Sequence, residues 1–291
     1  MSDAYAAAGV DTDQADRAVG ALVGVLGRIE LGRPSRSVVP SGHYASVLKV
    51  SAELGIAIAT DGVGSKLVIA EQTGRLDGVG IDCIAMNVND LVCVGAEPIA
   101  MVDYLAVEQA DPHALEQIAE GLRIGAMDAG IEIPGGELAV IPELIRGHPS
   151  PGGFDLCGTA IGTVGLGDLV LGDAIETGDA LIGIPSSGVH SNGYTLARRA
   201  LLEQGGLALG EHVDELGRAL ADELLEPTAI YVRAALELLH SEVRVHGLAH
   251  ITGDGLLNLR RLNDTVGFEI DDPLEPQPVF ELIARTPVRY R

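Results

Sequence analysis

Residues 56–66 read IAIATDGVGSK, an apolar run that breaks off into a carboxylate, two glycines, a hydroxyl and an ammonium group. The apolar part predicts a strand over 56–60, and the glycines predict a tight loop where that strand ends. Residues 44–50 predict a neighbouring strand, joined to the first by a turn at 53–55. The pattern therefore predicts paired strands that deliver Asp61 to a glycine-rich loop.

Helices and strands follow this stretch without a regular alternation. Apolar side chains recur at helical spacing over residues 81–92 and again over 111–129. Residues 98–107 and 154–164 predict buried strands, and the stretch 133–153, with its glycines and prolines, predicts a loop. Because the order lacks the strand–helix–strand rhythm of a doubly wound sheet, we predict an α+β fold.

A glycine-rich segment at residues 165–172 separates two patterns. We place a domain boundary there, which gives an N-terminal domain of residues 1–165 and a C-terminal domain of residues 166–291. One further helix is predicted before the boundary, over residues 13–28. After the boundary, the pattern predicts helices over 194–202, 213–225 and 228–239 and strands over 180–184 and 245–251.

The charge balance excludes whole classes of partner. Asp and Glu number 42 against 19 Lys and Arg, which gives a formal net charge of -23. A chain of this charge repels nucleic-acid backbones and anionic membranes, so we expect neither as a partner. The only lysines are Lys49 and Lys66, and an acidic surface poor in lysine suits a salt-rich cytoplasm. An ordinary acidic cytosolic enzyme is the alternative.

Localisation signals and cysteines both indicate a cytoplasmic protein. The first residues contain no apolar segment of the secretory type, and no uncharged run is long enough to span a bilayer. Three cysteines, Cys83, Cys93 and Cys157, lie among apolar neighbours without CxxC spacing. We therefore expect reduced core thiols and neither a disulfide nor a zinc site.

Two polar segments are candidates for a nucleotide site with its metal. Asp61 stands at a strand end, and NVND at residues 87–90 places Asn87 and Asp90 on one face of the predicted helix. Two carboxylates from separate elements can hold Mg²⁺ while nucleotide phosphates complete its coordination. The segment 61–66 does not match the GxxxxGK[ST] pattern of a P-loop. The alternative is a turn carboxylate beside a solvated helix face.

A second polar loop, PSSGVHSNG at residues 185–193, lies between a predicted strand and a predicted helix. Its serines, His190 and Asn192 suit a phosphate or carboxylate ligand. The loop does not fit the G-x-S-x-G nucleophile motif of serine hydrolases. TGDG at residues 252–255 and GGE at 135–137 are further glycine loops with a carboxylate. Turns, solvated loops and, for His190, a structural hydrogen bond are the simpler interpretations.

Taken in chain order, these segments resemble the phosphoribosylformylglycinamidine cyclo-ligase family, also called aminoimidazole ribonucleotide synthetases. The resemblance covers essentially the whole chain. It consists of nine motifs: YAAAGVD at 5–11, DGVGSK at 61–66, GIDCIAMNVND at 80–90, GAEP at 95–98, DY at 103–104, GGE at 135–137, SSGVHSNGY at 186–194, EPT with Tyr231 at 226–231, and HITGDG at 250–255.

This resemblance implies ATP- and Mg²⁺-dependent ring closure of formylglycinamidine ribonucleotide in purine biosynthesis. ATP would phosphorylate the formamide oxygen, an amidine nitrogen would attack the same carbon, and phosphate would leave. The resemblance also implies an N-terminal domain with flanking helices that forms a β-barrel with its copy in a homodimer. A C-terminal α/β domain would follow it.

The same match assigns site residues. Asp61 and Asp90 would bind Mg²⁺ and act in catalysis together with His190, and Lys66 would contact phosphate. The residues implied for the nucleotide are Gly62, Gly64, Ser65, Lys66, Asp82, Asn87 and Tyr104. Those implied for the substrate are Glu137, Ser187, Ser191 and Asn192.

Some positions depart from the family pattern. Ala6 stands where the family usually has a lysine, and Asp254 replaces a glycine. After Glu137, Leu138, Val140 and Ile141 replace polar or Met positions of the family. The family continues several dozen residues beyond Arg291, so we expect a shortened C-terminal domain. Two alternatives stay open. One is another ATP-using enzyme of the superfamily, of the selenophosphate synthetase, thiamine-monophosphate kinase or hydrogenase-maturation type. The other is a non-catalytic nucleotide-binding subunit.

Overall fold

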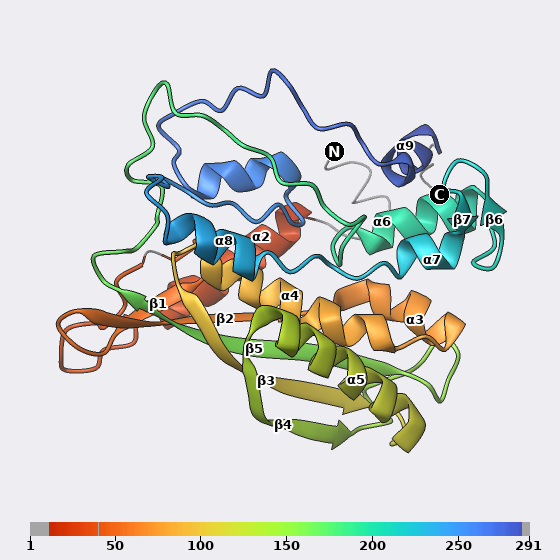
Figure 1. The fold of residues 1–291 in the computed structure, drawn as a ribbon. Helices are drawn as coiled ribbons and strands as arrows, with labels where there is room; N and C mark the ends of the chain where they lie inside the picture. The colour runs from red at the N-terminus through yellow and green to blue at the C-terminus, as the bar shows by residue number, and fades with distance from the viewer. Residues whose placement is uncertain (1–11, 40, 287–291) are drawn as a thin grey trace. The chain divides into compact units, whose positions relative to one another are not determined.

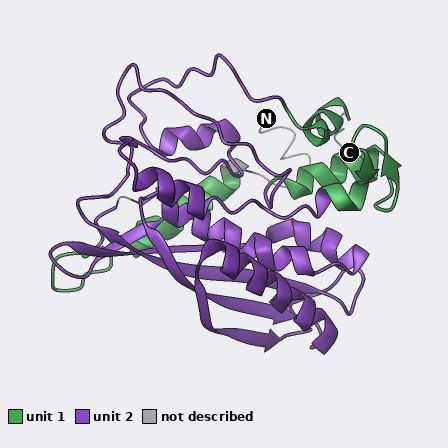
Figure 2. Cartoon of the chain, viewed as in Figure 1, with its two compact units in different colours: residues 1–36, 193–223, 276–291 green, residues 37–192, 224–275 purple. Residues whose placement is uncertain are grey.

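The computed structural model describes residues 12–39 and 41–286, and Figure 1 shows their fold. The motif at residues 5–11 lies outside the described residues. By its internal contacts the chain divides into two compact units, which Figure 2 draws in two colours. Unit 1 comprises residues 1–36, 193–223 and 276–291, and unit 2 comprises residues 37–192 and 224–275. The domain boundary at residue 165 stays a prediction.

A five-stranded sheet forms the centre of unit 2, in the order β1-β2-β5-β3-β4. Its strands are β1 (Ser46–Lys49), β2 (Leu54–Gly62), β3 (Glu97–Val107), β4 (Glu132–Val140) and β5 (Phe154–Gly165). All neighbours pair antiparallel except β3 and β4, which run parallel. The described strands form an open sheet, so the barrel expected from the resemblance would need strands from a second copy of the chain.

Two long helices, α4 (Asp77–Val92) and α5 (Pro112–Ala129), pack together in unit 2, and α4 lies on β2, β3 and β5 (Figure 1). The apolar face of α4 is fully buried against the inward side chains of the sheet. The two helices approach closely at Gly80 and Gly121, where a Cβ on either glycine would overlap the backbone of the other helix. The shorter helices of unit 2 are η1 (Gly64–Lys66), α3 (Leu67–Thr73), α8 (Val232–Leu239) and the 3₁₀ helix η3 (Gly255–Arg261).

Unit 1 consists mainly of short helices. They are α2 (Thr12–Leu26), α6 (Tyr194–Arg198), the π-helix η2 (Arg199–Gln204), most of α7 (Leu220–Leu224) and α9 (Pro278–Arg285), with a hairpin of β6 (His212–Val213) and β7 (Arg218–Ala219). Helix α9 packs against η2. Across the described ranges of both units, we find no helix with the length and apolar character that a bilayer crossing requires.

The predicted elements around Asp61 are confirmed. Strands β1, β2, β3 and β5 and helices α4 and α5 lie where the pattern placed them. Residues 133–153, predicted as a loop, instead begin with β4, although Pro134 and two glycines interrupt the pattern. The reason is that β4 is an edge strand, which needs ladder hydrogen bonds on one side only.

In the second half of the chain, two predicted strands and the start of one predicted helix differ from the structure. Residues 180–184 and 245–251, predicted as strands, form none, and within the described residues they pair with no other strand. The helix predicted over 213–225 begins only at Leu220, because the hairpin turn before it ends at Gly217 with a left-handed φ of 66°.

Candidate active site

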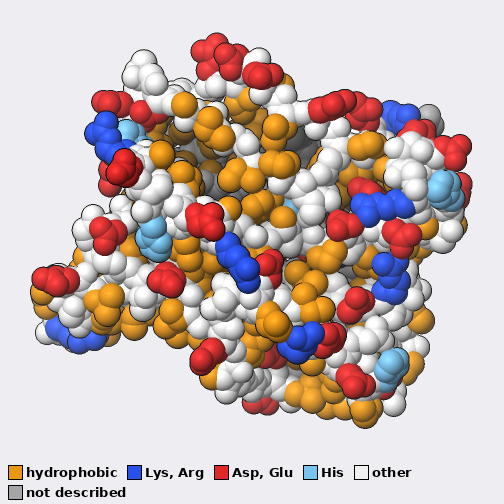
Figure 3. Space-filling view, viewed as in Figure 1, with side chains coloured by type: hydrophobic (Ala, Val, Ile, Leu, Met, Phe, Trp, Pro, Cys, Tyr) orange, Lys and Arg blue, Asp and Glu red, His pale blue; other side chains and the backbone are white. Residues whose placement is uncertain are grey.

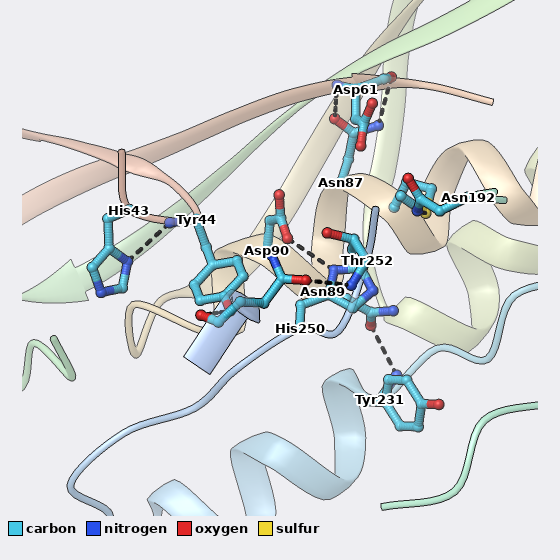
Figure 4. A network of polar contacts seen from close by, with 12 residues as sticks. His43, Tyr44, Asp61, Asn87, Asn89, Asp90, Asn192, Tyr231, His250 and Thr252 are labelled. Atoms are coloured by element: carbon cyan, nitrogen blue, oxygen red, sulfur yellow. Dashed lines mark hydrogen bonds and ion pairs between the residues drawn. The ribbon is translucent and has the colours of Figure 1, made fainter. Parts of the chain in front are cut away.

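The predicted site residues belong to unit 2, and Asp61 at the end of β2 is the first of them. Asn87 of α4 holds its backbone from both sides: the Asn87 Oδ1 accepts from the Asp61 N–H at 2.9 Å, and the Nδ2 donates to the Asp61 carbonyl at 3.2 Å (Figure 4). The same Nδ2 donates to the Cys83 carbonyl at 2.8 Å. Asn87 is fully buried, so it faces the sheet and not solvent, and it fixes the direction of Asp61.

The Asp61 carboxylate is partly buried and accepts a hydrogen bond from the Gly62 N–H at 2.8 Å. Burial raises the pKa of Asp61 above its usual value, the Gly62 N–H offsets part of that rise, and the charge of Asp90 adds to it. The two carboxylates are thus close enough to repel each other. Within residues 12–39 and 41–286, no group of three or more His, Cys, Asp or Glu side chains is arranged to hold a metal.

Asp90, near the end of α4, pairs with a histidine that the sequence analysis did not assign. His250 Nδ1 lies 2.8 Å from Asp90 Oδ1 (Figure 4), and the His250 side chain is buried. Its Nε2 has no hydrogen-bond partner among the described residues. The signal for His250 is present in the motif HITGDG at residues 250–255, which His250 opens and in which the glycines and Asp254 carry the stronger loop pattern.

His190 lies in a loop that holds it in an unusual backbone conformation, with φ of 61°. Burial lowers the pKa of His190 to about 4, and the charges of His250 and Lys66 contribute to the shift. The imidazole is therefore neutral at pH 7, and its Nε2 accepts from the Ser187 N–H at 3.1 Å. We call Asp61, Asp90, His190 and His250 the central cluster: Asp90 and His250 are paired, and the charge of His250 acts on the pKa values of both Asp61 and His190.

Two glycine loops meet beside this cluster. Gly64 has a left-handed φ of 73°, and a Cβ placed there would lie 4.0 Å from the Ser191 carbonyl oxygen. Asn192, next in that second loop, has its Nδ2 3.8 Å from the sulfur of Met86 in α4. The structure thus brings the predicted phosphate loop, with Gly62 and Ser65, next to the predicted substrate loop.

Lys66 and Asp82 lie deeper than the sequence predicted. Both side chains have no exposed surface, and the Lys66 Nζ lies 2.9 Å from Asp82 Oδ1 and 2.8 Å from Oδ2. The Nζ also donates to the Glu226 carbonyl at 2.7 Å. Burial lowers the pKa of Lys66, and the charge of Asp82 offsets part of this effect. Lys66 and Asp82 thus already have partners inside the chain, and their contacts with a nucleotide stay predictions.

Tyr104 and Glu137 are exposed residues on one row across the sheet. Gly62 of β2 pairs with Cys157 of β5, Cys157 pairs with Tyr104 of β3, and Tyr104 pairs with Glu137 of β4. Strands lie about 4.8 Å apart, so the backbone of Tyr104 is about 10 Å from Gly62 and that of Glu137 about 14 Å. Glu137 is therefore too distant to share one metal ion with Asp61, and a contact with a larger ligand is the role that stays open to it.

Two family models and several curated relatives match this chain. A family model described as "AIR synthase related protein, N-terminal domain" matches residues 42–164, and "AIR synthase related protein, C-terminal domain" matches residues 176–288. The phosphoribosylformylglycinamidine cyclo-ligase of Methanobrevibacter smithii is 50% identical over 246 residues, which are 84% of this chain and 70% of that protein. That of Thermococcus kodakarensis is 50% identical over 285 residues, 96% of this chain and 80% of that protein.

A solved structure described as "AaThiL complexed with AMPPCP and TMP" is similar in fold. Its TM-score is 0.52 at 16% sequence identity, and the match covers 76% of this chain and 61% of that one. At this identity the likeness concerns the fold alone.

Proposed function

This chain belongs to the phosphoribosylformylglycinamidine cyclo-ligase family, and on that premise we propose that it converts formylglycinamidine ribonucleotide to aminoimidazole ribonucleotide with ATP. One structural observation supports the proposal most: Asn87 and Asp90, one turn apart on α4, bond to Asp61 and to His250, so that three separate motifs converge on one helix. Isolated surface motifs would give no reason for such convergence.

The reaction makes few covalent demands on the protein. The γ-phosphoryl group of ATP passes to the formamide oxygen, the amidine nitrogen forms a bond to the formyl carbon, and the carbon–oxygen bond breaks as phosphate leaves. The nitrogen loses a proton as the ring becomes aromatic. Orientation and charge stabilisation are therefore the main tasks of the site.

The residues of the central cluster divide these tasks. Asn87 fixes Asp61, and Asp90 holds His250 in one orientation through Nδ1. The buried Nε2 of His250 has no hydrogen-bond partner among the described residues, so it is the ring atom left to bond a polar group of the substrate. The neutral His190 and Ser191 belong to the second glycine loop, and Gly64 of the first loop approaches the Ser191 carbonyl.

Mg²⁺ fits the acidic part of the cluster. Asp61 and Asp90 offer the oxygen donors that Mg²⁺ prefers. Burial is the main cause of the raised pKa of Asp61, and the charge of Asp90, which a bound divalent cation would offset, adds to it. When bound, the ion would neutralise charge on the phosphates of ATP. The nucleotide contacts proposed for Gly62, Gly64, Ser65 and Tyr104, and the substrate contacts of Glu137, Ser187, Ser191 and Asn192, follow from the family match.

We propose a homodimer on the exposed face of the sheet. Leu48, Val102, Tyr104 and Ile161 are between 36% and 44% exposed on the face that α4 does not cover. Light scattering at molar KCl should give twice the chain mass of 30.2 kDa, and Val102→Glu should halve that value. A wild-type mass of one chain would contradict the proposal.

Steady-state ADP formation tests the activity itself. The purified chain, with ATP and Mg²⁺ at molar KCl, should release ADP when formylglycinamidine ribonucleotide is added. Thiamine monophosphate is the matched alternative substrate, because the kinase alternative predicts ADP release with it instead. ADP release that depends on thiamine monophosphate and not on the ribonucleotide would replace the proposed function with the kinase.

A further inference from the structure

A buried ion pair lies beneath the site without touching its open surface. Lys66 belongs to η1 and Asp82 to α4, and neither side chain has any exposed area. The Lys66 Nζ directs hydrogen bonds to Asp82 and to the Glu226 carbonyl. An ammonium group in this position points toward residues 226–228 and away from solvent.

Asp82 fastens the same segment by a second set of bonds. Its Oδ1 accepts from the Thr228 N–H at 2.8 Å and from the Thr228 Oγ1 at 2.6 Å. Thr228 is only 1% exposed. Together with the bond from Lys66 to Glu226, these contacts hold both ends of residues 226–228 against η1 and α4.

Residues 226–228 in turn hold the loop of His190. The Ser187 Oγ donates to the Pro227 carbonyl at 2.6 Å, and Ser191 Oγ lies 3.2 Å from Thr228 Oγ1. Because the carboxylate of Asp82 can only accept, the Thr228 hydroxyl donates to Asp82 and must accept from Ser191. A directed chain therefore runs from Ser191 through Thr228 to Asp82, and ends on the charge of Lys66.

His190 lies between the two anchored serines. Its Nε2 accepts from the Ser187 N–H, and its backbone is held in the left-handed region that residues other than glycine rarely adopt. Such a conformation persists only where the surroundings fix it. Ser187 and Ser191, on either side of His190, bond to residues 226–228, and Lys66 and Asp82 hold that segment in turn.

We infer that Lys66, Asp82 and Thr228 are positioning residues that fix His190 in the site through residues 226–228, and that Lys66 is not a phosphate ligand. This inference rests on the proposed function only for the role that His190 plays. It differs from the assignment that the family match gave to Lys66 and Asp82. Thr228, which carries the connection, was not among the predicted site residues.

The experiment follows His190 in the free protein, without ATP or substrate. Proton NMR titration of the eight histidines gives their pKa values, and His190→Gln identifies the signal of His190. Thr228→Val keeps the side-chain shape but removes the hydroxyl, and Thr228→Ser keeps the hydroxyl. In Thr228→Val the pKa of His190 should rise from about 4 toward 6.5, by about one unit or more, while Thr228→Ser should stay near the wild type.

Kinetics and nucleotide binding provide the second readout. We expect Thr228→Val to lower kcat by roughly tenfold or more with KM for ATP changed less than about twofold, and Thr228→Ser to recover most of kcat. A wild-type His190 titration in Thr228→Val would overturn the inference. A Lys66→Met variant in which the pKa of His190 is unchanged but AMPPCP no longer binds would also overturn it, since that result would identify Lys66 as a phosphate ligand. Absence of cyclisation in the wild type would count against the proposed function alone, because the titration needs no substrate.

Discussion

Replacing Lys66 by Met removes one half of the buried ion pair and leaves the rest of the shape nearly unchanged. Asp82 then keeps its two hydrogen bonds from Thr228 but loses the cation 2.8 Å away, at a position with no exposed surface. Breaking a buried pair in this way costs about 3–5 kcal/mol of unfolding free energy. Because Thr228 still solvates the carboxylate in part, we expect a loss of about 3 kcal/mol. For a chain of this size that corresponds to a fall in Tm of about 6–12 °C.

Thermal unfolding by circular dichroism at one fixed molar KCl concentration measures this loss. The double variant Lys66→Met with Asp82→Asn should regain about 2 kcal/mol, because a neutral amide oxygen still accepts from Thr228 and no charge stays buried. Arg123→Met is the matched control, since it breaks a pair with Glu120 whose side chains are 56% and 49% exposed, and it should leave Tm close to that of the wild type. A Tm of Lys66→Met equal to that of Arg123→Met would contradict this prediction. So would a double variant whose Tm is no higher than that of Lys66→Met.

Three further predictions concern charge. Asp90→Asn should abolish the Mg²⁺-dependent binding of ATP, measured by calorimetry, and leave the fold intact. Asp264→Asn, at an exposed position, is the control and should bind ATP as the wild type does. Unchanged affinity in Asp90→Asn would remove Asp90 from the metal site. Acidic side chains are spread over the face shown in Figure 3, and the chain has a net charge of -23. Because salt screens the repulsion among these charges, Tm should rise steeply from dilute to molar KCl. A Tm that does not change over this range would reject salt adaptation. His190 binds a proton more weakly in the folded chain, with a pKa of about 4, than at its ordinary value of 6.5. Stability that is fully present above pH 6.5 should therefore be lost as pH falls toward 4, and His190→Gln should flatten that part of the pH–stability curve; an identical curve for the variant would contradict the buried, neutral His190.

Sequence periodicity located the elements that carry the site because local pattern alone determines them. The apolar run before Asp61 and the helical spacing of residues 81–92 correspond to β2 and α4 in the structure. The local pattern over β4 predicts a loop, since its two glycines and Pro134 carry a stronger turn signal than the strand's apolar residues. Edge pairing supplied what the local pattern lacked.

Long-range pairing could not be derived in this way. Asn87 was placed on a polar helix face, yet it is fully buried, because its amide satisfies the backbone of Asp61 where β2 passes over α4. Asp82 meets Thr228, which lies 146 positions further along the chain, and no period in the sequence connects the two. His250 and Thr228 stand inside motifs that the sequence analysis quoted, but their roles depend on which partner the fold brings to them.

The central claim is that this chain closes the imidazole ring by phosphorylating the formamide oxygen. The most direct measurement supplies formylglycinamidine ribonucleotide with ¹⁸O in its formyl group, together with ATP, Mg²⁺ and the purified chain at molar KCl. Mass spectrometry of the products should find one ¹⁸O atom in each molecule of released phosphate, in equal amount to the cyclised ribonucleotide. Phosphate released without the label, or labelled substrate left unchanged while ATP is hydrolysed, would contradict the account.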